Sequence, residues 1–164
     1  MIKNILIVSI IVSSYLLGMG DTINYDNQFN TQEEREVDAN AISSANVLSK
    51  LKLETFAFQE KNGKNVPVKR VKRGSKVVYI NRVSNLDRSP KRNIVVKNPI
   101  PRGTKYIIGS AKCENGCTIS FSTDGGRTFV DHEREGEEYN YIEFYFKEIP
   151  PLKKLRMGFR TIVK

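Results

Sequence analysis

Short segments rich in β-branched and aromatic residues run from Leu51 to the end of the chain, and this pattern constrains the fold most. Turn residues separate the segments at regular spacing, and no strong helical pattern lies between them. Lys61–Lys64 reads Lys-Asn-Gly-Lys, which predicts a tight hairpin turn, and Pro99 and Pro101 suit a strand end. The expected strands are 51–58, 66–71, 77–83, 93–97, 104–108, 118–122, 127–130, 141–146 and 155–163. This arrangement predicts an all-β sandwich or barrel.

The start of the chain has the form of an export signal. Lys3 precedes an apolar run, Ile5–Leu17, and the small residues Gly18 and Gly20 come just before polar Asp21. Small residues three and one before a break suit signal peptidase, and the run is short of the roughly 20 apolar residues that span a bilayer. We therefore expect residues 1–20 to be a cleaved signal peptide, with no membrane span afterwards, although a retained anchor is the alternative. The protein is expected to be exported: periplasmic, secreted or associated with the cell surface.

The rest of the chain divides into two parts. Residues 21–49 are rich in Asn, Gln, Glu and Ser, which predicts a flexible polar lead segment. Val37, Ala41, Ala45 and Leu48 have helical spacing, so a short helix there is the alternative. Residues 50–164 form the predicted β domain.

Two cysteines enclose a tight turn. Cys113 and Cys117 flank Glu114-Asn115-Gly116, and outside the cytoplasm such a pair predicts a disulfide. A zinc site would need more ligands, and His132 is the single histidine. No metal and no cofactor are therefore expected.

The stretch Phe121–Phe129, Phe-Ser-Thr-Asp-Gly-Gly-Arg-Thr-Phe, has the most motif-like spacing in the chain. Glycines tolerate the positive φ angles of a tight hairpin, and an Asp side chain can accept hydrogen bonds from its own turn. The spacing resembles the Asp-box hairpin of sialidases, a turn that does not touch substrate. We expect a structural turn, not an active site, formed by Ser122, Asp124, Gly125, Gly126 and Thr128.

Two longer blocks, Gly74–Asn85 and Asn93–Tyr106, carry a family resemblance. They are similar to the G-D-x-V-x-Y-x-I-x-V-x-N and N-V-V-I-x-D-P-I-P-x-G-T-x-Y blocks of a bacterial cell-surface repeat domain, the family catalogued as domain of unknown function number eleven. Ser75 and Asn81 depart from its usual Asp and apolar residue. The resemblance spans about Leu51 to Lys164. It implies an immunoglobulin-like antiparallel β-sandwich of about seven to nine strands, used as a spacer or stalk and not for catalysis.

The charge of the chain is uneven. The formal net charge is +9, and Asp87 is the single acid among fourteen Lys and Arg between Lys61 and Lys105. A patch of these cations would suit an anionic glycan, lipopolysaccharide or lipid headgroup. The alternative is that these Lys and Arg residues only protect an edge strand from pairing and keep the domain soluble. Aromatic residues are absent from 61–76, which argues against specific nucleic-acid binding. The candidate patch residues are Lys69, Arg70, Lys72, Arg73, Arg88, Lys91 and Arg92.

No catalytic residue is predicted. His132 lies in a polar loop, and a nucleophilic triad needs a base held beside its nucleophile. Glu135, Glu137 and Glu138 could pair as hydrolase acids, but solvated surface acids are the expected reading. The sequence therefore predicts a non-enzymatic structural or interaction module of the bacterial envelope, with envelope proteins or anionic surface polymers as partners. An adhesin-like binder of anionic ligands is the alternative, with a small secreted hydrolase behind it.

Overall fold

The computed structural model describes residues 6–9, 23–24, 50–68 and 70–164. One sheet has six strands: in spatial order β4 (Lys64–Pro67), β3 (Leu51–Lys61), β6 (Lys76–Asn85), β12 (Lys154–Val163) and β8 (Thr104–Tyr106), with β9 (Lys112–Cys113) also paired to β12. The second sheet contains β1 (Leu6–Ser9), β7 (Lys91–Pro99), β11 (Tyr141–Ile149) and β10 (Thr118–Ser122). A small pair joins β2 (Ile23–Asn24) to β5 (Arg70–Val71).

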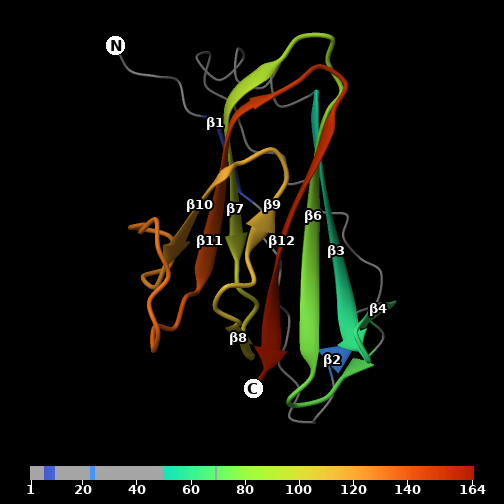
Figure 1. Cartoon of the computed structure of the whole chain (residues 1–164), viewed down its shortest axis with the longest axis vertical. Coiled ribbons are helices and arrows are strands. Elements are labelled where there is room, and N and C mark those ends of the chain that lie inside the picture. Colours follow the sequence, from blue (N-terminus) through green and yellow to red (C-terminus); the bar gives the residue numbers. More distant parts are fainter. Residues whose placement is uncertain (1–5, 10–22, 25–49, 69) are drawn as a thin grey trace, which may run out of the picture.

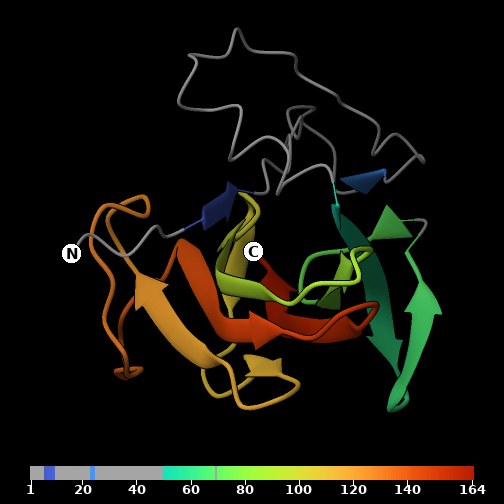
Figure 2. The same ribbon diagram turned by 90° about the horizontal axis from the view of Figure 1, so that it is seen from above.

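The two larger sheets face each other, and from β6 onward four chain crossings connect them: β6 to β7, β7 to β8, β9 to β10 and β11 to β12. β6 leads into β7 in the opposite sheet, and β11 leads back into β12; β7 pairs antiparallel with β11, and β6 pairs antiparallel with β12. Figure 1 shows β3, β6 and β12 side by side on one side of the molecule, with β7, β10 and β11 on the other. In the view from above, β10 and β4 lie at opposite flanks (Figure 2). The predicted all-β antiparallel sandwich is confirmed.

Alternating side chains place the core between the sheets. In β12, Leu155, Met157 and Phe159 are buried, whereas Arg156 is exposed and Arg160 is half-buried. This period of two is the signature of a strand with one face on a core. An aromatic cluster completes one region of the core, with ring centroids 5.2 to 6.4 Å apart among Tyr79, Tyr106, Phe121, Tyr139 and Phe159.

A buried amide pair joins the two sheets inside this apolar core. Asn81 of β6 is 1% exposed, and its Nδ2 donates to Asn98 Oδ1 of β7 at 2.6 Å. Burying a lone amide would be costly, but a partner from the facing sheet offsets part of that cost. Asn81 therefore makes a polar contact between the sheets among apolar core residues.

Several local expectations can be compared directly with the structure. The Asn62-Gly63 hairpin is confirmed, with φ angles of 50° and 73° and a β3–β4 register that pairs Lys61 with Lys64. The expected strand 127–130 is wrong: only Val130 bridges to Phe121. In the predicted signal segment, β1 pairs in parallel with β7, from Leu6 opposite Ile94 to Ser9 opposite Lys97. Of the lead segment, only Ile23–Asn24 is described, so its expected flexibility lies outside the described residues.

Candidate functional site

The Ser122–Thr128 stretch is a turn closed by its own side chains. Asp124 Oδ1 accepts from the backbone N–H groups of Arg127 and Thr128 at 3.1 and 3.0 Å, and Oδ2 accepts from Thr128 Oγ1 at 2.7 Å. Ser122 Oγ donates to Asp124 Oδ1 at 2.7 Å and accepts from Gly126 N at 2.9 Å. The bonds from the Thr128 backbone and hydroxyl hold the pKa of Asp124 well below its usual value. Because the turn itself occupies this carboxylate, its role in the structure is architectural.

The same turn explains why the strand expected at 127–130 does not form. The N–H groups of Arg127 and Thr128 point to Asp124, so they are not free to donate to a ladder. The chain rejoins β10 only at Val130, which exchanges both backbone hydrogen bonds with Phe121 at 2.8 and 2.9 Å. The result is a loop closed by a single bridge, not a two-residue hairpin.

The two cysteines lie at the start and end of the turn after β9. Cys113 and Cys117 form a disulfide with an S–S distance of 2.02 Å, as predicted. Asn115 and Gly116 between them both have φ of 59°, the left-handed geometry of a tight turn. Over the described ranges, no group of three or more His, Cys, Asp or Glu side chains could hold a metal ion.

The predicted basic patch is divided between the two ends of β6. Lys72 and Arg73 are exposed just before this strand, and Arg88 is exposed just after it. A ten-residue strand is about 33 Å long, so these cations do not form one compact site. Lys69 lies outside the described residues, as does the side chain of Arg70.

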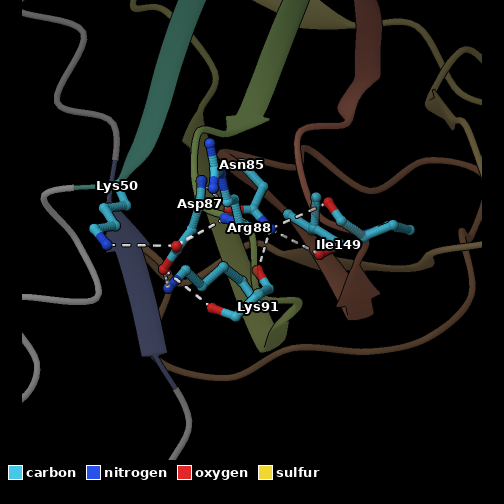
Figure 3. Close-up of polar contacts among 8 residues, drawn as sticks. Lys50, Asn85, Asp87, Arg88, Lys91 and Ile149 are labelled. Carbon is cyan, nitrogen blue, oxygen red and sulfur yellow. Dashed lines mark hydrogen bonds and ion pairs between the residues drawn. The ribbon is translucent and has the colours of Figure 1, made fainter.

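Asp87, just after β6, is the centre of a network that includes Lys91 and Lys50 (Figure 3). Its carboxylate accepts from Lys91 Nζ at 2.7 Å and pairs with Lys50 Nζ at 3.4 Å. The bond from the buried Lys91 ammonium is the largest cause of a pKa well below the usual value for Asp87. Arg92 pairs with Glu148 of the neighbouring strand at 2.8 Å. Lys91 and Arg92 are therefore already engaged within the domain.

Asn85 ties this network to the crossing between β11 and β12. Its side chain is 1% exposed, and Nδ2 lies within 3.1 Å of the carbonyl oxygens of Ser89, Ile149 and Pro150. Its Oδ1 accepts from the backbone N–H of Asp87 at 3.0 Å. One amide therefore holds the β6–β7 and β11–β12 crossings together, as the dashed lines in Figure 3 show.

The polar loop that contains the histidine contributes a contact absent from our predictions. Glu133 accepts from the Tyr106 hydroxyl and from the backbone N–H of Gly109, the latter at 2.6 Å. Burial, reinforced by the Glu133 bond, raises the pKa of Tyr106 well above its usual value. His132 is exposed beside Asp131, with 2.8 Å between Nδ1 and Oδ1.

The three other glutamates of this loop, Glu135, Glu137 and Glu138, are exposed, and Glu138 pairs with Lys164 at 3.2 Å. These acids lie at the surface, whereas Glu133 fastens the loop to the domain.

A groove that we did not predict from the sequence lies on the outer face of the six-stranded sheet. Two hollows of about 320 and 330 Å³ adjoin there and share Ser110, Lys112 and Arg160. We call them together the Gly158 groove, because Gly158 lies in its floor between Arg156 and Arg160. A Cβ on Gly158 would lie 2.4 Å from the carbonyl oxygen of Tyr79, so the close approach of two backbones requires glycine here.

Strand register explains which residues meet in the Gly158 groove. Gly158 lies opposite Ile80 of β6 and Lys112 of β9, and Arg160 lies opposite Val78. Directly paired residues of antiparallel strands share a face, so these side chains line one surface. The sequence feature that could have indicated this groove is the alternation Arg156-x-Gly158-x-Arg160 within a strand, because a glycine in a strand often marks the close approach of another backbone.

Both arginines of the Gly158 groove are paired with glutamates. Arg156 Nη2 lies 2.7 Å from Glu114 Oε1, and Arg160 Nε lies 3.1 Å from Glu60 Oε2. The hydrogen bond from the Arg156 side chain is the largest cause of the lowered pKa of Glu114. These pairs hold the two guanidinium groups on either side of the glycine.

No family model, curated protein or solved structure matches the chain. Within the described segments, no helix has the length and apolar character needed to cross a membrane.

Proposed function

We propose that the chain is an exported, non-enzymatic module that works by contact with another component of a bacterial envelope or surface. The observation that carries the proposal is that each described side chain with a shifted pKa is hydrogen-bonded within the fold. Every shifted carboxyl group has a lowered pKa, and Tyr106 has a raised one. These groups keep their ordinary charge states at neutral pH, whereas a general acid or base works best with a pKa near the working pH.

Most of the shifted groups connect parts of the sandwich. Glu54 of β3 pairs with Arg82 of β6 at 3.1 Å, Glu114 binds Arg156 of β12, and Asp87 binds Lys91. Such contacts order a scaffold and its turns. They support a spacer or interaction role, in which the broad faces of the sandwich meet a partner.

Expression of the full chain with a C-terminal tag in a bacterial host tests export and the absence of a reaction. We expect the chain outside the cytoplasm, with an intact mass that corresponds to loss of residues 1–20, and recovery with the envelope at low salt. The purified exported form should turn over no substrate in an esterase, glycosidase, peptidase and phosphatase panel. A cytoplasmic, unprocessed chain, or turnover abolished by a single Glu135→Gln, Glu137→Gln or Glu138→Gln change, would contradict the proposal.

Binding of an anionic polymer is a second candidate, supported by the exposure of Lys72, Arg73 and Arg88. Because β6 separates these cations, a long glycan could reach both ends, whereas one lipid headgroup could not. The test is retention of the full chain on immobilised heparin over a salt gradient, beside Lys72→Glu/Arg73→Glu and Arg88→Glu variants. Retention reduced in both variants supports the polymer; retention unchanged in both excludes this site.

A further inference from the structure

We propose that the Gly158 groove binds an extended acidic peptide segment of a partner protein, with an apolar side chain of that segment seated over Gly158. This inference rests on the proposed contact function and names the surface and the chemistry of the partner. The apolar floor of the groove, the balance of its charges and the spacing of its two arginines support this assignment.

The floor of the groove is apolar and lacks a side chain at its centre. Val78 is 6% exposed although it faces away from the core, and Ile80 lies beside it in the same row. Gly158 has no side chain to cover the space opposite Ile80. A hollow of about 320 Å³ at this point has room for one large apolar or aromatic side chain of a ligand.

The charges around the floor favour an anion. Four cations line the two hollows, Lys76, Lys112, Arg156 and Arg160, against two carboxylates, Glu60 and Glu114. Each carboxylate is already paired with an arginine, and within the described part of the chain Lys76 and Lys112 have no ion pair. The surplus is therefore positive and directed to solvent.

The paired arginines retain donors for a ligand. A guanidinium has five N–H donors in a planar fork, and the Glu60 and Glu114 bonds use only part of each set. Arg156 has a side chain 68% exposed and Arg160 one 42% exposed. Because their glutamates hold them in place, both guanidinium groups can donate to a ligand carboxylate with less loss of side-chain entropy than free arginines.

The spacing of the two forks selects an extended ligand. Arg156 and Arg160 are four residues apart on one face of β12, which corresponds to about 13 Å along the strand. Two acidic residues four positions apart in an extended peptide have the same separation, and the residue midway between them faces the same side. A peptide of the pattern acid-x-apolar-x-acid would therefore place carboxylates at both arginines and its apolar side chain over Gly158.

The first arm of the test uses the full chain and fluorescent peptides that contain Glu-Thr-Phe-Thr-Glu. Backbone amide NMR shifts and fluorescence anisotropy report the site and the affinity. We expect shifts concentrated in β12, in β9 and at Ser110. Binding should weaken about tenfold or more when both glutamates become glutamines or when they are placed next to each other. Shifts spread over other surfaces, or equal binding of the rearranged peptide, would overturn the proposal.

The second arm uses variants that keep the net charge constant. Arg156→Gln/Glu114→Gln and Arg160→Gln/Glu60→Gln each remove one pair from the Gly158 groove. Arg92→Gln/Glu148→Gln removes a comparable pair from the other sheet. Each groove variant should bind the peptide about tenfold or more weakly, and the control should bind as the original chain does. Equal affinity in all three would contradict the proposal, and the NMR map of the unchanged chain decides the matter if a groove variant does not fold.

A third arm separates the occupants. Heparin and vesicles that contain phosphatidylglycerol are added as competitors of the Glu-Thr-Phe-Thr-Glu peptide. The contrary result is a competitor that displaces the peptide and shifts the β12 and β9 amide signals at a lower concentration than the peptide itself requires. That result would assign the groove to a polymer or a membrane and overturn the peptide proposal. If no peptide binds but the full chain still associates with envelopes, this inference fails while the proposed contact function stands.

Discussion

Replacement of Asn85 tests whether one buried amide holds the β6–β7 and β11–β12 crossings together. Its Nδ2 carries two N–H donors for three carbonyl oxygens, and its Oδ1 accepts one further bond from Asp87 N. One donor is shared, so Asn85→Ala removes about three full hydrogen bonds from a side chain that is 1% exposed. At about 1 kcal/mol for each net hydrogen bond, the free energy of unfolding should fall by about 3 kcal/mol.

Asn85→Asp sharpens the test because it keeps the shape and removes the donors. Its carboxylate would face the carbonyl oxygens of Ser89, Ile149 and Pro150 and could not donate to them at neutral pH. The folded state then raises the pKa of the new carboxyl group, so the loss of stability of this variant compared with wild type becomes smaller as the pH falls. We expect a loss of stability at pH 7 at least as large as that of Asn85→Ala, and a smaller loss near pH 5.

Urea unfolding of the full chain, followed by far-ultraviolet circular dichroism, measures both effects. The difference in free energy of unfolding is compared at constant slope m, so that a change in the unfolded state is recognised. A loss below about 1 kcal/mol for Asn85→Ala, or an Asn85→Asp variant as stable as wild type at pH 7, would refute the reasoning.

Three further predictions concern other parts of the domain. Gly158→Ala should destabilise the fold by about 1–3 kcal/mol, since its Cβ would lie 2.4 Å from the Tyr79 carbonyl oxygen; an unchanged urea midpoint would show that the strands can move apart. Cys113→Ser/Cys117→Ser should cost about 2 kcal/mol, the low end for a disulfide, because the closed loop is short; calorimetry under oxidising and reducing conditions measures it. Asp124, Glu114 and Asp87 have lowered pKa values in the fold, so their contribution to stability is complete above their usual values of 3.8 to 4.5 and is lost as the pH falls through the folded values. The thermal midpoint should therefore decrease as the pH is lowered below about 4. Asp124→Asn should make the thermal midpoint less dependent on pH, and a pH profile identical to that of the wild type would contradict the role assigned to Asp124.

Much of the fold could be predicted because strands carry a local signal. The alternation in β12, the Asn62-Gly63 turn and the proline-bounded end of β7 depend on neighbours in sequence. The strand expected at 127–130 was wrong because Asp124 captures the N–H groups that a ladder would need. Such competition between a side chain and the ladder is decided by geometry that a residue pattern does not specify.

The contacts between distant segments could not be predicted from pattern alone. Lys112, Gly158 and Ile80 share a face only because of the β9–β12 and β12–β6 registers. The basic run appeared continuous in sequence, but β6 places Lys72 and Arg88 at opposite ends of a strand. Asn81 was noted only as a departure from the resembled family, since its partner Asn98 comes from the facing sheet.

Equilibrium binding of the purified full chain to isolated bacterial envelopes, followed by sedimentation over a salt series, tests the contact function most directly. We predict saturable binding that weakens as salt rises, because charged groups contribute to the contact. Binding should also be reduced in Arg156→Gln/Glu114→Gln but not in Arg92→Gln/Glu148→Gln. Absence of saturable binding at low salt would contradict the claim that this sandwich works by contact with an envelope component.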